Sequence, residues 1–147
     1  MDDRFFVHRE EYPITAGDFS AAGDASARIK YVLRKLGIDS ALVRRAAIAA
    51  YESEINMVIH SAGGTLTLTV DRDTIRLLAR DRGPGIPDID LAMQEGYSTA
   101  TEAIRELGFG AGMGLPNMRR CSDRFTIRSS PGGTVIDMEF TIGKESG

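Results

Sequence analysis

The sequence predicts an α+β fold: a two-layer α/β sandwich whose mixed or antiparallel sheet carries its helices on one face. The first reason is the order of the expected elements, which is strand, two helices, hairpin, loop, helix, hairpin. This order has no repeated strand-helix-strand unit, so a doubly wound parallel sheet fits less well. The second reason is size, because 147 residues with 42% hydrophobic and 27% charged residues suffice for one core. We therefore expect a single domain over residues 1–147.

The chain begins with an expected strand and a first helix. Residues 4–9 are rich in Phe and Val, and Tyr12-Pro13-Ile14 continues in an extended conformation because proline restricts the residue before it. Apolar residues then recur at helical spacing from Phe19 to Leu36. Asp18 is a suitable N-cap for this helix and Gly37 is a natural stop.

The second helix begins at Asp39 or Ser40 and ends at Ala62-Gly63-Gly64. Its polar residues Glu52, Asn56 and His60 stand at i, i+4 and i+8 and so share one face. Another face is expected to be apolar and is formed by Ile48, Tyr51, Ile55 and Ile59. Taken alone, this polar stripe is as compatible with a solvated helix face as with a functional site.

Glu54 competes with Glu52 for any functional role of an acidic residue in this helix. The two residues point about 200° apart around the helix axis. Glu54 therefore lies off the stripe that contains Asn56, and Glu52 is the better candidate.

The middle of the chain predicts a β-hairpin and a loop. Residues 66–70 and 75–79 alternate apolar and polar side chains on either side of the turn at 71–73. Residues 80–87 contain glycine and proline and form a loop, and Asp88 can cap a short helix that runs to Met93.

The last third predicts a helix and a second hairpin. Residues 96–108 show no clear periodicity and are expected to be mobile. A helix from Leu115 to Cys121 follows, and two alternating strands around Phe125–Ile127 and Ile136–Phe140 are joined by a Pro-Gly-Gly turn.

Glycines at 108, 110, 112 and 114 immediately precede the expected helix that begins at Leu115. Backbone amides freed by the lack of Cβ, together with the helix N-terminus, can bind phosphate oxygens. The alternative is a flexible linker. The run is not a Walker A loop, because Leu115 stands where that motif needs lysine, and its spacing does not fit a dinucleotide-binding fingerprint.

Asp81 ends the second strand of the first hairpin and is followed by Gly83 and Gly85. A carboxylate fixed beside open backbone can accept a hydrogen bond from a flat ligand, such as the exocyclic amino group of adenine. On its own, this aspartate is better explained as a turn residue.

The composition excludes several classes of function. A net charge of −3 argues against non-specific nucleic-acid binding, and we expect the pairs Arg44-Arg45 and Arg119-Arg120 to be solvated helix faces. One cysteine, Cys121, and two histidines provide neither an internal disulfide nor a structural zinc site. No stretch has the apolar length of a signal peptide or a membrane span, so we expect a cytoplasmic protein.

Three motifs occur together in this chain: Glu52-x-x-x-Asn56, Asp81-x-Gly83-x-Gly85 and the Gly-x-Gly-Met-Gly run that ends at Gly114. Their order resembles the GHKL ATPase family, which includes gyrase, histidine kinases and MutL, from about Phe19 to Phe140. Within it, the chain looks most like the small serine/threonine kinases of the anti-sigma factor type and the related stressosome switch kinase. The resemblance implies a Bergerat-type ATP-binding fold.

The resemblance also implies roles for single residues. Asn56 matches the magnesium-coordinating asparagine, Glu52 matches the general base, and Asp81 matches the adenine-reading aspartate. The remaining implied contacts to the nucleotide are Gly83, Gly85, Gly110, Gly112, Met113, Gly114 and Thr134.

The chain departs from this family in the segment before the last glycines. Between Gly96 and Gly108, where many relatives place a basic group for the γ-phosphate, only Arg105 is basic. Hydroxyls that can serve instead are those of Ser98, Thr99 and Thr101, although such a loop is more often merely solvated. His60 is more often structural at a helix end than a metal neighbour.

The function implied by the resemblance is phosphoryl transfer from Mg2+-ATP to a serine or threonine of a STAS-type antagonist. A sigma factor or a phosphatase would be the second partner, and a homodimer is possible because several relatives pair through their sheets. One alternative is an ATP-dependent binding module without useful catalysis. Another is a detached histidine-kinase catalytic domain, which is disfavoured because His8 lies in a strand-like segment rather than in a dimerisation helix.

Overall fold

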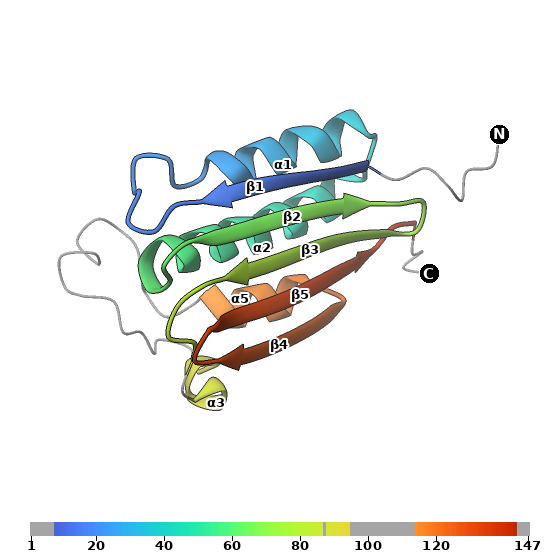
Figure 1. Ribbon diagram of the computed structural model, residues 1–147. Coiled ribbons are helices and arrows are strands. Elements are labelled where there is room, and N and C mark those ends of the chain that lie inside the picture. Colours follow the sequence, from blue (N-terminus) through green and yellow to red (C-terminus); the bar gives the residue numbers. More distant parts are fainter. Residues whose placement is uncertain (1–7, 87, 95–113, 144–147) are drawn as a thin grey trace.

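The computed structural model describes residues 8–86, 88–94 and 114–143 (Figure 1). One sheet of five strands in the order β1-β2-β3-β5-β4 forms one layer, and α1, α2 and α5 lie side by side on one of its faces. The elements are β1 (His8–Ile14), α1 (Asp24–Lys35), α2 (Ser40–His60), β2 (Gly64–Val70), β3 (Thr74–Asp81), α3 (Ile89–Ala92), α5 (Gly114–Cys121), β4 (Arg124–Ser130) and β5 (Gly133–Thr141). The predicted α+β sandwich is confirmed.

Every strand pairing in the described sheet is antiparallel, so of the two predicted arrangements the antiparallel one is found. Both hairpins lie where alternation predicted them, and β5 pairs with β3 as well as with β4. The edge strand β1 includes Pro13, because an edge position tolerates a residue without an N–H group. The expected start of this strand, at residues 4–7, lies outside the described residues.

The start of α1 was predicted wrongly. The helix begins at Asp24, and Gly23 precedes it with φ 102°, a left-handed conformation that suits glycine. Asp18 does not cap the helix but holds a turn, because its Oδ1 accepts hydrogen bonds from Ser20 Oγ at 2.7 Å and from the Ala21 N–H at 3.3 Å. Because of this turn and the left-handed glycine, the helix begins at Asp24 instead of at Phe19.

The central helix α2 is capped as predicted, since the Asp39 carboxylate accepts hydrogen bonds from the Ala41 N–H at 3.1 Å and the Leu42 N–H at 3.4 Å. Its buried face differs from the expected one, because Ile48 and Tyr51 are each 39% exposed. The helix packs between α1 and α5 as well as onto the sheet, so a broad face is buried. That face consists of Leu42, Val43, Ala46, Ala49, Ala50, Ser53, Glu54, Ile55, Met57 and Val58.

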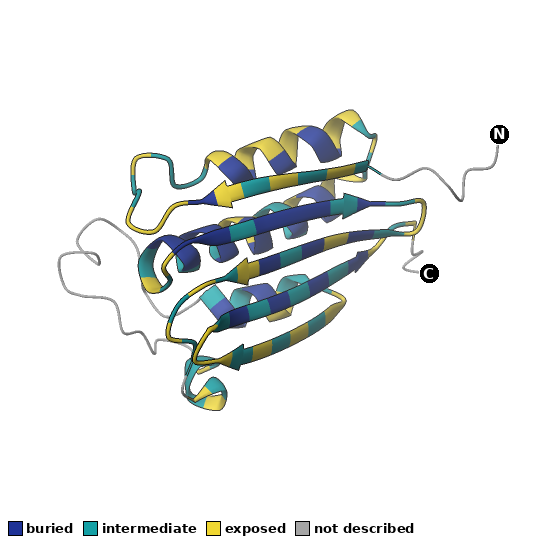
Figure 2. Cartoon of the chain, in the orientation of Figure 1, coloured by how far each residue is buried: buried dark blue, intermediate teal, exposed yellow. Residues whose placement is uncertain are grey.

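The core fills the space between the two layers, and Figure 2 shows buried positions alternating along β3 and β5. Its largest fully buried side chains are Phe140, Ile29, Leu33, Leu66, Leu68, Ile75, Leu77, Met118 and Met138. No helix in the described part of the chain is long and apolar enough to cross a membrane.

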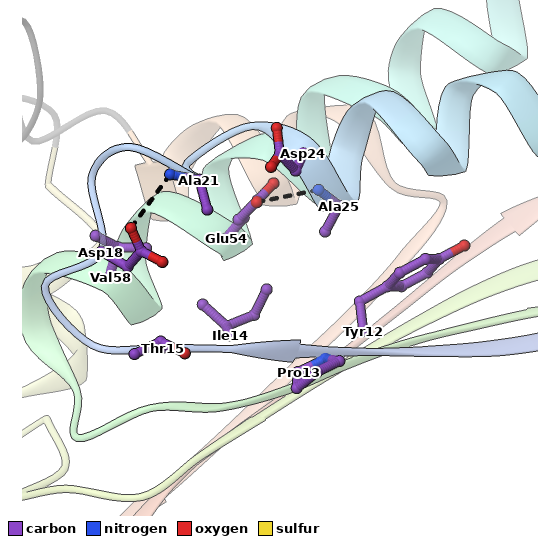
Figure 3. Close-up of a pocket in the computed structure, with 10 residues that line it drawn as sticks. All are labelled: Tyr12, Pro13, Ile14, Thr15, Asp18, Ala21, Asp24, Ala25, Glu54 and Val58. Carbon is purple, nitrogen blue, oxygen red and sulfur yellow. Dashed lines mark hydrogen bonds between the residues drawn. The ribbon is translucent and has the colours of Figure 1, made fainter.

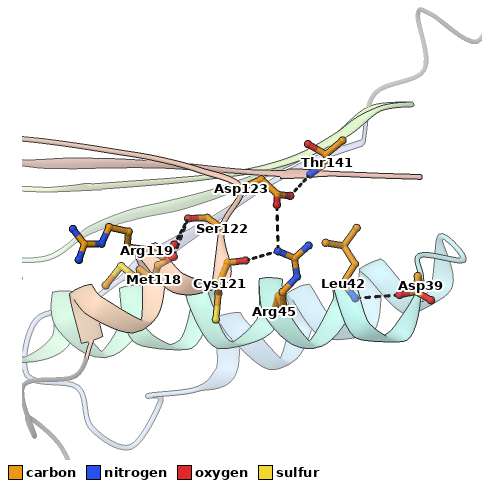
Figure 4. A network of polar contacts seen from close by, with 9 residues as sticks. All are labelled: Asp39, Leu42, Arg45, Met118, Arg119, Cys121, Ser122, Asp123 and Thr141. Carbon is orange, nitrogen blue, oxygen red and sulfur yellow. Dashed lines mark hydrogen bonds and ion pairs between the residues drawn. The ribbon is translucent and has the colours of Figure 1, made fainter. Parts of the chain in front are cut away.

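Arg45 lies near the N-terminal end of α2 and connects this helix to α5 and, through Asp123, to β5 (Figure 4). Its Nη1 donates to the carbonyl oxygen of Cys121 at 2.9 Å and lies 3.4 Å from Asp123 Oδ1. Asp123 in turn accepts the Thr141 N–H at 2.7 Å. Arg44 is exposed as expected, but Arg45 corrects the expectation of a solvated pair, because it holds the last turn of α5 against α2 and β5.

Candidate functional site

Asn56 of α2 faces the first residue of α5. A Cβ added at Gly114 would lie 3.2 Å from Asn56 Oδ1, which is tighter than most contacts of this kind. Glycine at this position therefore lets the helix start directly against the amide group of Asn56. Two of the predicted residues, one from the helix stripe and one from the glycine run, are thus brought together.

Glu52 lies one turn before Asn56 on α2, and its partly buried side chain faces α5. Its Oε2 accepts a hydrogen bond from Asn117 Nδ2 at 2.9 Å. The Oδ1 atom of Asn117 accepts one from Arg120 Nη2 at 2.8 Å. Asn117 was missed by the sequence analysis, and its place three residues after Gly114, on the same helical turn, was the only available signal.

Asp81 and Thr134 meet at the end of the sheet, where β3 ends and β5 begins. Asp81 Oδ1 accepts a hydrogen bond from the Thr134 N–H at 2.9 Å, and Thr134 is 4% exposed. Burial raises the pKa of the Asp81 carboxyl, and the hydrogen bond from the Thr134 backbone opposes this rise. The carboxylate is fixed, partly desolvated and able to accept a further hydrogen bond.

The loop after Asp81 folds onto the turn that joins β4 and β5. A Cβ at Gly85, where φ is 79°, would collide with the carbonyl oxygen of Ser130. Ser129 Oγ accepts the Ile86 N–H at 2.6 Å and shares a hydrogen bond with Thr134 Oγ1 at 2.8 Å. Ser129 is a second residue that the sequence analysis missed, because nothing in the sequence sets it apart from other strand serines.

The two halves of the site are joined at the C-terminal end of α2. A Cβ at Gly83 would lie 3.4 Å from Ser61 Cα, and the Ala62 N–H donates to the carbonyl oxygen of Arg82 at 2.7 Å. The Asp81 loop therefore packs directly after the helix that carries Glu52 and Asn56.

Several predicted residues lie outside the described residues. These are Gly110, Gly112 and Met113, together with Ser98, Thr99, Thr101 and Arg105. His60 is the exposed last residue of α2. Among the described residues no group of three or more His, Cys, Asp or Glu side chains is placed to hold a metal ion.

Glu54 lies on the opposite side of α2 and is 2% exposed (Figure 3). Its two carboxylate oxygens accept the Ala25 N–H at 3.1 Å and the Ser26 N–H at 3.0 Å, so it caps α1 from a neighbouring helix. It also lines a pocket of about 270 Å3, bounded by β1, the start of α1 and Val58. The residues proposed for nucleotide and metal do not line this pocket.

Comparison with known proteins places this chain in a family. Residues 18–140 match the family described as "Histidine kinase-like ATPase domain". The serine/threonine-protein kinase RsbT of Bacillus subtilis is 33% identical over 110 residues, covering 71% of this chain and 77% of that protein. The anti-sigma F factor of a Thermoanaerobacter species is 32% identical over 107 residues, covering 72% and 67%.

Two solved structures share the fold. The RsbU and RsbW domains of Rv1364c from Mycobacterium tuberculosis align with a TM-score of 0.64 at 17% identity, over 92% of this chain and 32% of the mycobacterial chain. The SiaB-SiaC complex from Pseudomonas aeruginosa aligns with a TM-score of 0.51 at 12% identity, over 90% of this chain and 89% of the matched chain. The match over residues 18–140 and the similarity to RsbT establish that this chain belongs to the histidine kinase-like ATPase family.

Proposed function

We propose that this chain is an ATP-dependent serine/threonine protein kinase that acts by partner switching in the cytoplasm. It phosphorylates a small STAS-type antagonist and binds a sigma factor or a phosphatase as its second partner, with pairing of two copies through their sheets as an additional possibility to test. The names of the relatives, a serine/threonine-protein kinase and anti-sigma F factors, support both activities.

The contact between Asn56 and the start of α5, with Glu52 one turn away, is the observation that carries the proposal. An amide oxygen is a hard ligand suited to Mg2+, which is usually bound through few protein ligands and several phosphate oxygens and waters. The Asn56 side chain fits that role, because its oxygen lies at a helix N-terminus, where unpaired N–H groups favour phosphate.

Each residue of the site has one task in this proposal. Bound Mg2+-ATP supplies an activated phosphoryl group. Asn56 would hold the metal, Asp81 would accept a hydrogen bond from the adenine amino group, and Glu52 would accept the proton of the acceptor hydroxyl. The backbone amides of residues 112–114 would stabilise charge on the transferred group. Gly83, Gly85 and Thr134 shape the adenine end, and Gly110 belongs to the phosphate loop.

The fit of adenine is supported by the environment of Asp81. One carboxylate oxygen is held by the Thr134 N–H, and the other has no hydrogen-bond partner within the described ranges. Gly85 and Gly133 have no space for a Cβ against the neighbouring backbone, so the surrounding turns are tightly packed. A fixed acceptor beside closely packed backbone suits a planar base.

The test compares the parent protein with Glu52→Ala and with Glu11→Ala, an exposed control on β1. Affinity for Mg2+-ATP is measured by calorimetry, and transfer of labelled γ-phosphate is measured to STAS-domain proteins of the same organism. We expect Glu52→Ala to bind ATP normally and to lose transfer by about 100-fold or more, whereas Glu11→Ala behaves like the parent.

Two other results would redirect the proposal. ATP binding by a parent that phosphorylates no STAS protein would favour an ATP-dependent binding module over a kinase. A parent that does not bind ATP at all would overturn the nucleotide site. Binding is also visible by thermal shift, because a ligand at a hundredfold its dissociation constant adds about 2.7 kcal/mol to the free energy of unfolding.

A further inference from the structure

We infer that Asn117 is a positioning residue that orients the Glu52 carboxylate for phosphoryl transfer and links this orientation to the start of α5. The inference rests on the proposed kinase function. It extends that function to a residue that lies outside the three sequence motifs.

The two carboxylate oxygens of Glu52 have different surroundings. Oε2 is held by Asn117 Nδ2 at 2.9 Å, whereas Oε1 has no hydrogen-bond partner within the described part of the chain. A carboxylate held through one oxygen presents the other in a fixed direction. Oε1 is therefore the oxygen that accepts the proton of an acceptor hydroxyl.

Arg120 determines which end of the Asn117 amide faces Glu52. The guanidinium donates to Asn117 Oδ1 at 2.8 Å, so that oxygen is taken and the NH2 group points toward the carboxylate. The chain of contacts from cation to amide to carboxylate also polarises the amide and strengthens its donation. Glu52 is thereby linked to the Arg120 cation through the Asn117 amide.

Asn117 and Gly114 belong to the same turn of α5. Gly114 abuts Asn56, and Asn117 holds Glu52, so the helix start that faces the proposed metal ligand moves together with the group that orients the proposed base. Any displacement of α5 changes both at once.

The alternative is that this hydrogen bond merely fastens α5 to α2. The helix has other anchors, because Leu115, Pro116 and Met118 are buried, and Ser53 Oγ lies 3.4 Å from Met118 Sδ. We therefore expect variants at Asn117 to fold, which allows the two roles to be separated.

The experiment compares the parent, Asn117→Ala and Asn117→Asp, with Arg119→Ala as control, since Arg119 is an exposed cation of the same helix. Steady-state transfer to the STAS substrate is measured with Mg2+-ATP at neutral pH. For Asn117→Ala we expect kcat to fall about tenfold, the effect of losing one hydrogen bond to a charged group, with KM for ATP within about twofold of the parent.

The division of the effect between kcat and KM, together with a spectroscopic signal, supplies readouts that a structural role would not change. Asn117→Asp should lower kcat further than Asn117→Ala, because a second carboxylate then lies beside Glu52. Carbon-13 NMR of labelled glutamate carboxyls should show a changed chemical shift for Glu52 in both variants without any substrate. Arg119→Ala should leave both kcat and this chemical shift unchanged.

An unchanged kcat and an unchanged Glu52 carboxyl chemical shift in folded Asn117→Ala would overturn the inference. A fall in kcat of Asn117→Ala that is accompanied by a lower unfolding temperature, but by no change at the Glu52 carboxyl, would also overturn it. A parent that transfers no phosphate to any STAS protein would instead overturn the proposed function. The chemical shift of the Glu52 carboxyl would then still decide whether Asn117 holds Glu52.

Discussion

Replacing Glu54 by glutamine separates the two acidic residues of α2 by their effects. Glu52 and Glu54 are two residues apart, yet Glu52 contacts α5 and Glu54 contacts α1. We predict that Glu54→Gln destabilises the fold and leaves the chemistry of the site intact. Glu52→Gln should have the opposite effect.

The magnitude follows from the cap that Glu54 provides. The carboxylate accepts two backbone N–H groups, at 3.1 and 3.0 Å, and is 2% exposed. Glutamine retains one acceptor oxygen but turns its NH2 group toward the other N–H. One charge-assisted hydrogen bond is lost, about 1.5–3 kcal/mol, and a buried donor remains unsatisfied, about 1–3 kcal/mol. Allowing for relaxation into the adjacent pocket, we expect about 3 kcal/mol and a fall in Tm of roughly 6–12 °C.

The assay is urea unfolding of the parent, Glu54→Gln and Glu52→Gln, followed by phosphotransfer well below the unfolding midpoint of each protein. Glu54→Gln should unfold at lower urea and retain transfer, whereas Glu52→Gln should unfold like the parent and lose transfer. The reasoning is refuted if Glu54→Gln lies within about 1 kcal/mol of the parent, because a cap of this kind contributes at least that much. Loss of transfer in folded Glu54→Gln would refute the assignment of the base.

Two further predictions concern Asp81, at the end of β3, and Arg45, near the start of α2. Because burial raises the pKa of Asp81, its favourable contribution to stability is present below the unfolded-state pKa and is lost as pH rises through the folded-state pKa. Asp81→Asn should therefore be more stable than the parent at neutral pH, and this gain in stability should vanish in acid. The same variant should bind ATP more weakly. Thermal melts across pH check the stability, and calorimetry checks the affinity for ATP. Arg45→Met should lose about 1 kcal/mol in urea unfolding, since Arg45 is 39% exposed and screened; a loss above about 3 kcal/mol would contradict this account.

Much of the fold was predictable because its signals are local. Both hairpins followed from alternation, and the start of α2 followed from the Asp39 cap. The start of α1 was predicted wrongly because its cap is not local: the carboxylate that accepts the Ala25 N–H belongs to Glu54, which is 29 residues away. Asp18 carried an equally good capping signal and formed a turn instead.

The site shows the same contrast between local signals, which could be read from the sequence, and contacts between residues distant in sequence, which could not. Glu52, Asn56 and Asp81 were identified from spacing and resemblance, and the structure brings Asn56 to Gly114 and Asp81 to Thr134. Their roles with ATP and Mg2+ stay predictions. Asn117 and Ser129 were missed for the same reason, because each contacts a partner that is distant in sequence, Glu52 and Ile86 respectively.

The apolar face expected for α2 is buried at Ile55 but exposed at Ile48 and Tyr51, and the reason bears on the orientation of Glu52. Ile48 and Tyr51 point outward because the helix packs against the sheet through smaller residues, which leaves Glu52 and Glu54 on its two flanks. A rotation of about 100° would remove Glu54 from α1 and Glu52 from Asn117. Both contacts therefore require the same rotation of one rigid helix. If Glu54→Gln retains transfer at the parental rate, the buried alanines of α2 are sufficient to hold that rotation.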